Sequence, residues 1–256
     1  MNDRKKYLME TRHLISDTFN SDREIEKSAY FPNKVLIING WGGSGKTCIC
    51  NVFKAIKGIE NMRYSTEIEL ISHLWLSENI DLNSAKTLIA TLSDYIIYNL
   101  FQSREINIRP SDLSSIFNSP IWYKYIFRLF SKGGEDCVKH ITNKTILNLV
   151  THNLFQCNSL LKASLEEKLI FVEVARDPLY MLSQLKYNQD TIYTKRSPRN
   201  FTLNYKSTGR PIPDGLSSLD DRNSDNWERA MNYLEKRMEI YFDSTSKISY
   251  QSKRSP

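Results

Sequence analysis

Several features that would place a chain in a specialised class of protein are missing from this sequence. Its 256 residues contain four cysteines, none of them in the C-x-x-C spacing of a zinc or redox site. No apolar run approaches the roughly 20 residues that a membrane-spanning helix needs. No apolar signal segment follows the charged residues near the start. These absences predict a cytoplasmic chain with reduced thiols and no membrane span, and we assign no metal ligands.

The charge balance is moderate, and its sign still limits the choice of partner. Lys and Arg exceed Asp and Glu by 35 to 29, which gives a net charge of +6, and 40% of the residues are hydrophobic. A mildly basic chain suits a small polyanion such as a nucleotide, but the charge is too diffuse to indicate nucleic acid. No internal repeat is present. We expect one globular domain over residues 1–256.

One stretch joins an apolar strand to a glycine-rich turn and a helix-compatible segment. After the apolar run Val35–Ile38, the residues Gly40, Gly45, Lys46 and Thr47 fit the pattern G-x-x-x-x-G-K-[ST]. Glycines let successive backbone N–H groups surround an anion, and the helix that follows points its positive end there. Lys46 adds a mobile positive charge, and the Thr47 hydroxyl suits a phosphate oxygen or Mg²⁺. The stretch predicts a phosphate-binding P-loop; the alternative is a turn that binds nothing.

Strand and helix patterns alternate on both sides of this loop. Further strands are expected at 59–64, 145–150 and 168–175, and helices at 84–101, 112–130, 154–162, 179–185 and 227–242, with a last strand at 248–250. The pattern predicts an α/β protein with a three-layer P-loop fold and a central parallel sheet. Around this sheet we expect a helical extension at 1–30, an α-helical insertion at 78–142 and a polar lid-like loop at 189–226.

Polar residues follow two of the expected strands. Thr151-His152 comes after the first, and Arg176-Asp177-Pro178 comes after the second. Ligands of open parallel sheets collect at the carboxyl ends of the strands, so these residues and the loop are expected to share one edge. Glu67 and Glu69 follow the expected strand 59–64. They lie either at the rim of that site or, as we favour, at a solvated helix N-terminus, where carboxylates are stabilised.

The segment from Ile146 to Leu185 resembles the sulfotransferase family. In that family a strand ending in Lys-Thr-His precedes a strand ending in Arg-(Asn/Asp)-Pro and a helix, as Val150-Thr151-His152 and Arg176-Asp177-Pro178 do here. The family also begins with a P-loop-like segment that binds the 5′-phosphosulfate of 3′-phosphoadenosine 5′-phosphosulfate. The resemblance implies transfer of a sulfuryl group from this nucleotide to a hydroxyl acceptor, either a carbohydrate or another small metabolite.

The resemblance also implies a role for each matching residue. It assigns Gly42, Gly43, Ser44, Gly45, Lys46 and Thr47 to the 5′-phosphosulfate, Arg176 and Ser183 to the 3′-phosphate, and catalysis to His152 as base together with Lys46. Ser183 lies seven residues after Arg176, whereas the family places its serine eight residues after and this chain has Gln184 there. His152 alone of the four histidines lies in a motif. The alternative role of His152 is to cap the next helix.

Two other functions fit the same residues. A full Gly-Ser-Gly-Lys-Thr is common among kinases and NTPases, in which Lys46 would hold the β and γ phosphates of ATP or GTP and Thr47 the Mg²⁺. That function needs an acid at a strand end, and the candidates are Glu173 and Asp177, the latter also a helix cap. The third possibility is a nucleotide-binding protein without catalysis.

Overall fold

The computed structural model describes most of the middle of the chain. The described residues are 25–194, without 132, 135, 137, 138, 140, 142 and 143, and then 225, 227, 228, 230–232, 234, 235, 238, 239, 241 and 242. The predicted strand at 248–250, most of the extension at 1–30 and most of the lid-like loop therefore lie outside the described residues. Within them, no helix is long and apolar enough to cross a membrane.

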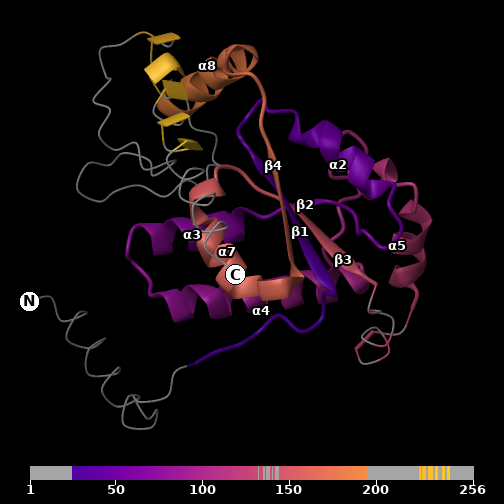
Figure 1. Cartoon of the computed structure of the whole chain (residues 1–256). Coiled ribbons are helices and arrows are strands. Elements are labelled where there is room, and N and C mark those ends of the chain that lie inside the picture. The colour runs from indigo at the N-terminus through magenta and orange to yellow at the C-terminus, as the bar shows by residue number, and fades with distance from the viewer. Residues whose placement is uncertain are drawn as a thin grey trace, which may run out of the picture.

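A parallel sheet forms the centre of the described fold (Figure 1). Its strands are β1 (Lys34–Gly40), β2 (Arg63–Tyr64), β3 (Ile146–Val150) and β4 (Leu169–Val174), in the order β2-β3-β1-β4. Pairing is parallel throughout, with Ile38 opposite Val150 and Gly40 opposite Val174. The predicted α/β fold with a parallel sheet is therefore confirmed. Because β1 lies between β3 and β4, its carboxyl end has both of their ends as neighbours.

Helices cover both faces of this sheet. The described helices are α2 (Lys46–Lys54), α3 (Thr66–Leu76), α4 (Leu82–Phe101), α5 (Trp122–Leu129), α7 (Asn158–Leu165) and, beyond the end of β4, α8 (Pro178–Thr194) (Figure 1). Successive side chains of a strand point to opposite faces. Val35 and Ile37 therefore pack with α3, α4 and α7, whereas Leu36 and Ile38 pack with α2. Each such buried aliphatic side chain contributes roughly 1.5–3 kcal/mol.

Helix α4 is a central part of one helical layer, although it falls within the region predicted as an insertion. Its residues Ala85, Ile89 and Ala90 are fully buried in the larger core. The helix begins after Asp81, whose carboxylate accepts hydrogen bonds from the backbone N–H and the hydroxyl of Ser84. The cap is therefore Asp81, and the helix begins two residues before the predicted start at residue 84.

A buried carboxylate of α4 also fixes the chain as it enters β1. Asp94 accepts hydrogen bonds from the backbone N–H groups of Tyr30 at 2.7 Å and Phe31 at 2.8 Å, and it pairs with Lys27. Residues 25–30 have no helical structure, so the predicted N-terminal helix does not extend through them. Charge-assisted bonds of this kind contribute roughly 1.5–3 kcal/mol each.

Several predicted boundaries differ from the structure, and the predicted helix 154–162 is α7 at Asn158–Leu165. The second strand is reduced to Arg63–Tyr64, with only an isolated bridge at Ile59. The predicted helix 112–130 begins at Trp122, because Pro120 ends the short 3₁₀ turn that precedes it. Helix α8 continues to Thr194 and so includes the first part of the predicted lid-like loop.

Candidate functional site

The glycine loop, residues 40–47, connects the end of β1 to the start of α2. Gly45 precedes α2 with φ 94° and ψ 13°, a left-handed conformation that glycine adopts without strain. Gly45 has no side chain to cap the helix. Its carbonyl accepts from the Cys48 backbone N–H, whereas no acceptor for the backbone N–H groups of Lys46 and Thr47 is found among the described residues. These N–H groups and the positive end of the helix dipole therefore face the loop. The arrangement suits an anionic group.

Two polar side chains complete the glycine loop. The Ser44 hydroxyl is buried and has no hydrogen-bond partner among the described residues. Lys46 is 6% exposed, and its ammonium donates to the carbonyl oxygens of Gly40 and, at 2.8 Å, Trp41. An anionic oxygen would attract this ammonium more strongly than two carbonyls do, because both partners would then be charged.

A buried amide joins the carboxyl ends of three strands. The Asn39 side chain is fully buried and donates to Glu173 Oε2 on β4 at 2.6 Å. Its Oδ1 accepts from Thr151 Oγ1, directly after β3, and from the Leu154 backbone N–H, both at 3.0 Å. Asn39 therefore fixes the ends of β1, β3 and β4 relative to one another. It also fixes the turn that carries His152.

Lys46 and Glu173 share a poorly solvated region at this edge of the sheet. Burial lowers the pKa of Lys46 from 10.5 to about 8, although the charges of Glu69 and Glu173 oppose that shift. Burial also raises the pKa of Glu173 from 4.5 to about 7, against the hydrogen bond from Asn39 and the charge of Lys46. Charges interact strongly where water is excluded. An anionic ligand would therefore favour the ammonium form of Lys46.

His152 is held by a carboxylate from a different helix. Glu69 Oε1 on α3 lies 2.7 Å from the His152 backbone nitrogen, which donates to it, and 3.1 Å from His152 Nδ1. The Tyr64 ring lies nearly parallel to the imidazole at 6.1 Å between centroids. An ionised carboxylate only accepts hydrogen bonds, so it favours the neutral tautomer with the proton on Nδ1. Nε2 is then a proton acceptor, and 42% of the side chain is exposed.

Arg176 reaches the glycine loop from the end of β4. Its Nη1 donates to the Gly43 carbonyl at 3.2 Å, and its guanidinium lies 5.3 Å from the centroid of the Tyr180 ring. Figure 1 shows α8 beyond the end of β4. On α8, Ser183 is exposed, whereas a Cβ added to Gly43 would lie 3.0 Å from the Cβ of Gln184. Gln184 and Met181, and not Ser183, are therefore the residues of this helix that lie against Gly43.

The structure brings most of the predicted site residues to one edge of the sheet. The glycine loop follows β1, His152 lies two residues after β3, and Arg176 lies two residues after β4. The roles of Asn39 and Tyr64 were not predicted from the sequence. Asn39 does carry a signal: it is a polar residue at the end of an apolar strand, directly before the loop. Glu69, which we expected at a solvated helix N-terminus, is bonded to His152 instead.

Comparison with known proteins identifies no relative of this chain. No protein-family model, curated protein or solved structure matches the chain. The interpretation of the site therefore depends on its residues and their geometry.

Proposed function

We propose that this protein is a sulfotransferase-like enzyme that transfers a sulfuryl group from 3′-phosphoadenosine 5′-phosphosulfate to a hydroxyl acceptor. The observation that supports this most is the orientation of His152. Its Nδ1 lies 3.1 Å from Glu69, which leaves Nε2 to accept a proton at the strand edge that also carries the glycine loop. Lys46 supplies a buried positive charge at the same edge.

The chain offers a matching set of groups for the nucleotide. The glycine loop would hold the 5′-phosphosulfate through the N–H groups of the first turn of α2, the Ser44 hydroxyl and Lys46. Arg176 would hold the 3′-phosphate, because its planar guanidinium forms paired hydrogen bonds with phosphate oxygens. Ser183 would help it only after a change of orientation, since Gln184 packs on the loop.

The proposed roles of the side chains follow the movement of one proton and one negative charge. The hydroxyl oxygen of the acceptor forms a bond to sulfur, and His152 Nε2 takes up the proton that this hydroxyl loses. Glu69 stabilises the imidazolium that results. Lys46 stabilises the charge on the bridging oxygen as the sulfur–oxygen bond to the nucleotide breaks. The nucleotide supplies the sulfuryl group, and the acceptor is a sugar or another small hydroxyl compound.

Calorimetry with two nucleotides tests this function. We expect adenosine 3′,5′-bisphosphate to bind without added metal, and ATP with Mg²⁺ to bind more weakly. An Arg176→Ala variant should lose affinity for the bisphosphate by about 10-fold or more, because hydrogen bonds to charged groups contribute roughly 1.5–3 kcal/mol. Its affinity for adenosine 5′-phosphate, which lacks the 3′-phosphate, should stay nearly unchanged.

The alternative function is a kinase or NTPase, favoured by the position of Lys46 and the closeness of a buried acid. Glu173 interacts electrostatically with Lys46 and would be the acid nearest to a metal-bound phosphate. Tight, Mg²⁺-dependent binding of ATP without binding of the bisphosphate would support this alternative and contradict our proposal. Binding of a nucleotide without any turnover would instead support a protein that binds but does not catalyse.

The pH dependence of bisphosphate binding should report the state of Lys46. Because its pKa is lowered to about 8, the free protein loses the ammonium as the pH rises through that value. The affinity for the bisphosphate should therefore change little below pH 8. Well above pH 8, where Glu173 is already ionised, the affinity should decrease by about 10-fold for each further pH unit. Calorimetry from pH 7.5 to 9.5 measures this. A Lys46→Met variant should bind more weakly and lack the decline, and an equal decline in both proteins would contradict the assignment.

A further inference from the structure

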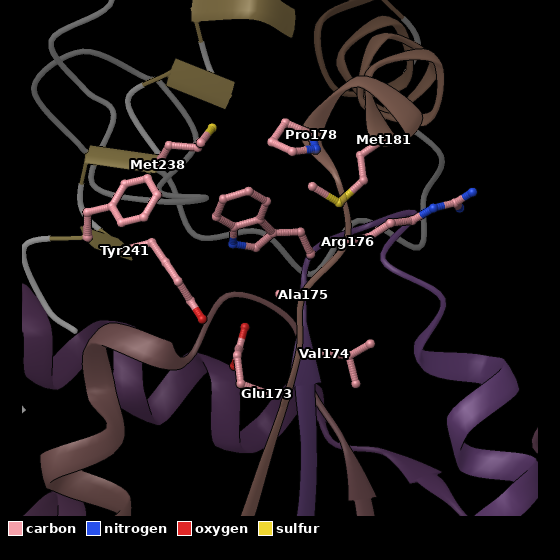
Figure 2. A pocket seen from close by; sticks show the side chains of 10 residues that line it. Glu173, Val174, Ala175, Arg176, Pro178, Met181, Met238 and Tyr241 are labelled. Atoms are coloured by element: carbon pink, nitrogen blue, oxygen red, sulfur yellow. The ribbon is translucent and has the colours of Figure 1, made fainter.

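A cavity of about 170 Å³ lies beside the end of β4 (Figure 2), and His152 is not among the residues that line it. Its apolar wall includes Trp41, Pro178, Met181, Met238 and Tyr241, and its base includes the carboxylate of Glu173. Figure 2 shows this carboxylate directed into the space below Pro178, Met181 and Tyr241. Of the residues that line the cavity, Arg176 alone has a role in the proposed transfer reaction.

The size and the walls of the cavity fit a flat ring. A protein cavity of about 150 Å³ is large enough to bind benzene. The rings of Trp41 and Tyr241 meet edge to face with centroids 6.2 Å apart, and Tyr241 also lies 4.6 Å from Phe155. Rigid aromatic edges and faces favour an aromatic guest over a flexible or strongly hydrated one. A sugar, which has a hydroxyl on most carbons, would leave many of its polar groups without partners against this wall.

Glu173 determines which polar group such a ring should carry. Its Oε2 accepts the hydrogen bond from Asn39, and no other hydrogen bond to this carboxylate is found among the described residues. Burial raises its pKa to about 7, so the ionised form is poorly solvated and gains from a donor. Lys46 already supplies a positive charge nearby. A neutral N–H or O–H therefore suits the free oxygen better than a second cation does.

We infer that this cavity binds a small aromatic molecule that donates a neutral hydrogen bond to Glu173. The ring fills the space between Trp41, Met181 and Tyr241, and the donor points to the base of the cavity. This inference is independent of sulfuryl transfer, because it concerns binding in the absence of any nucleotide.

Indole and 1-methylindole form a matched pair of probes. Indole has a single N–H donor and no competing acceptor, and methylation removes that donor while keeping the rings. In a ligand-observed NMR titration of the full chain without nucleotide, we expect indole to bind about 10- to 100-fold more tightly than 1-methylindole. Equal affinities, or no binding of indole, would overturn the inference. Tighter binding of benzylammonium than of indole would also overturn it, by assigning the cavity to cationic amines.

Two variants test the place and the polar contact. Ala175 lines the cavity and is exposed, so Ala175→Phe should fill the space and weaken indole binding at least 10-fold. Leu179→Phe, at a residue of α8 that is 78% exposed and outside the cavity lining, is the matched control and should bind indole normally. Unchanged binding by Ala175→Phe would place the ligand elsewhere.

The Glu173→Gln variant separates the carboxylate from the shape of the cavity. Since Asn39 donates to one oxygen of Glu173, the amide should turn its oxygen to Asn39 and its NH₂ to the cavity. The preference for indole over 1-methylindole should then fall below about 3-fold. A preserved preference would show that the donor does not reach Glu173, and would refute this part of the inference even if the ring binds.

Discussion

Replacement of His152 by alanine is expected to lower the turnover of the proposed sulfuryl transfer by about 10²–10⁴-fold, the usual contribution of a general base. The fold should not suffer, because the imidazole is 42% exposed and the backbone N–H of this residue keeps its bond to Glu69. Steady-state assays at saturating donor and acceptor measure the turnover, and calorimetry with the bisphosphate checks that the nucleotide still binds with nearly unchanged affinity.

The Glu69→Gln variant separates the proton acceptor from the group that positions it. The amide oxygen can still accept from the His152 backbone N–H and from Nδ1–H, so the ring should keep its orientation. It cannot balance the charge of an imidazolium, so turnover should fall to a value between those of the wild type and His152→Ala.

Rescue of turnover by added imidazole distinguishes a catalytic role of His152 from a purely structural one. It should partly restore the turnover of the His152→Ala variant, because the free base can enter the space left by the side chain, and it should not restore Glu69→Gln. Near-normal turnover of a folded His152→Ala variant would remove His152 from the mechanism. Loss of folding would instead assign the residue a structural role.

The sheet was predictable because its two central strands, β1 and β3, are buried over almost their whole length. β1 contains the apolar run Val35–Ile38, and β3 is apolar apart from Asn148, which is the pattern of parallel strands between two helical layers. The predicted helix 112–130 is too long because its hydrophobic spacing continues across the 3₁₀ turn Ile116–Asn118 and across Pro120, whereas α5 begins only at Trp122. Periodicity alone therefore located the elements better than it located their ends.

The contacts that organise the site could not be predicted from local sequence patterns, because they join residues far apart in the chain. Glu69 and His152 are 83 residues apart, and a carboxylate near a helix N-terminus is explained equally well by the helix dipole. Asn39 joins Glu173 and Thr151, which lie 134 and 112 residues away. The order of the strands decides which ends become neighbours, and no single stretch of sequence contains that order.

The glycine loop provides the second large effect, on stability. Gly40 has φ 151°, outside the range that L-residues prefer, and a Cβ added to it would lie 2.5 Å from the Val174 carbonyl oxygen and 2.9 Å from Ser44 Oγ. Val174 is the residue of β4 paired with Gly40, so the obstacle is backbone that cannot move without disturbing the sheet. Gly40→Ala should therefore lower the free energy of unfolding by roughly 2–5 kcal/mol, the combined cost of backbone strain and overpacking.

Gly45→Ala is the matched control, because Gly45 also has a positive φ but lacks the obstacle. Its φ is 94°, but nothing lies within 4 Å of an added Cβ. The cost should be that of the left-handed conformation alone, roughly 1–2 kcal/mol. Urea denaturation of the wild type and both variants, followed by far-UV circular dichroism, gives the three free energies. Equal losses in the two variants would mean that strain alone requires glycine at these positions, and that the close approach of β4 to Gly40 does not limit the loop.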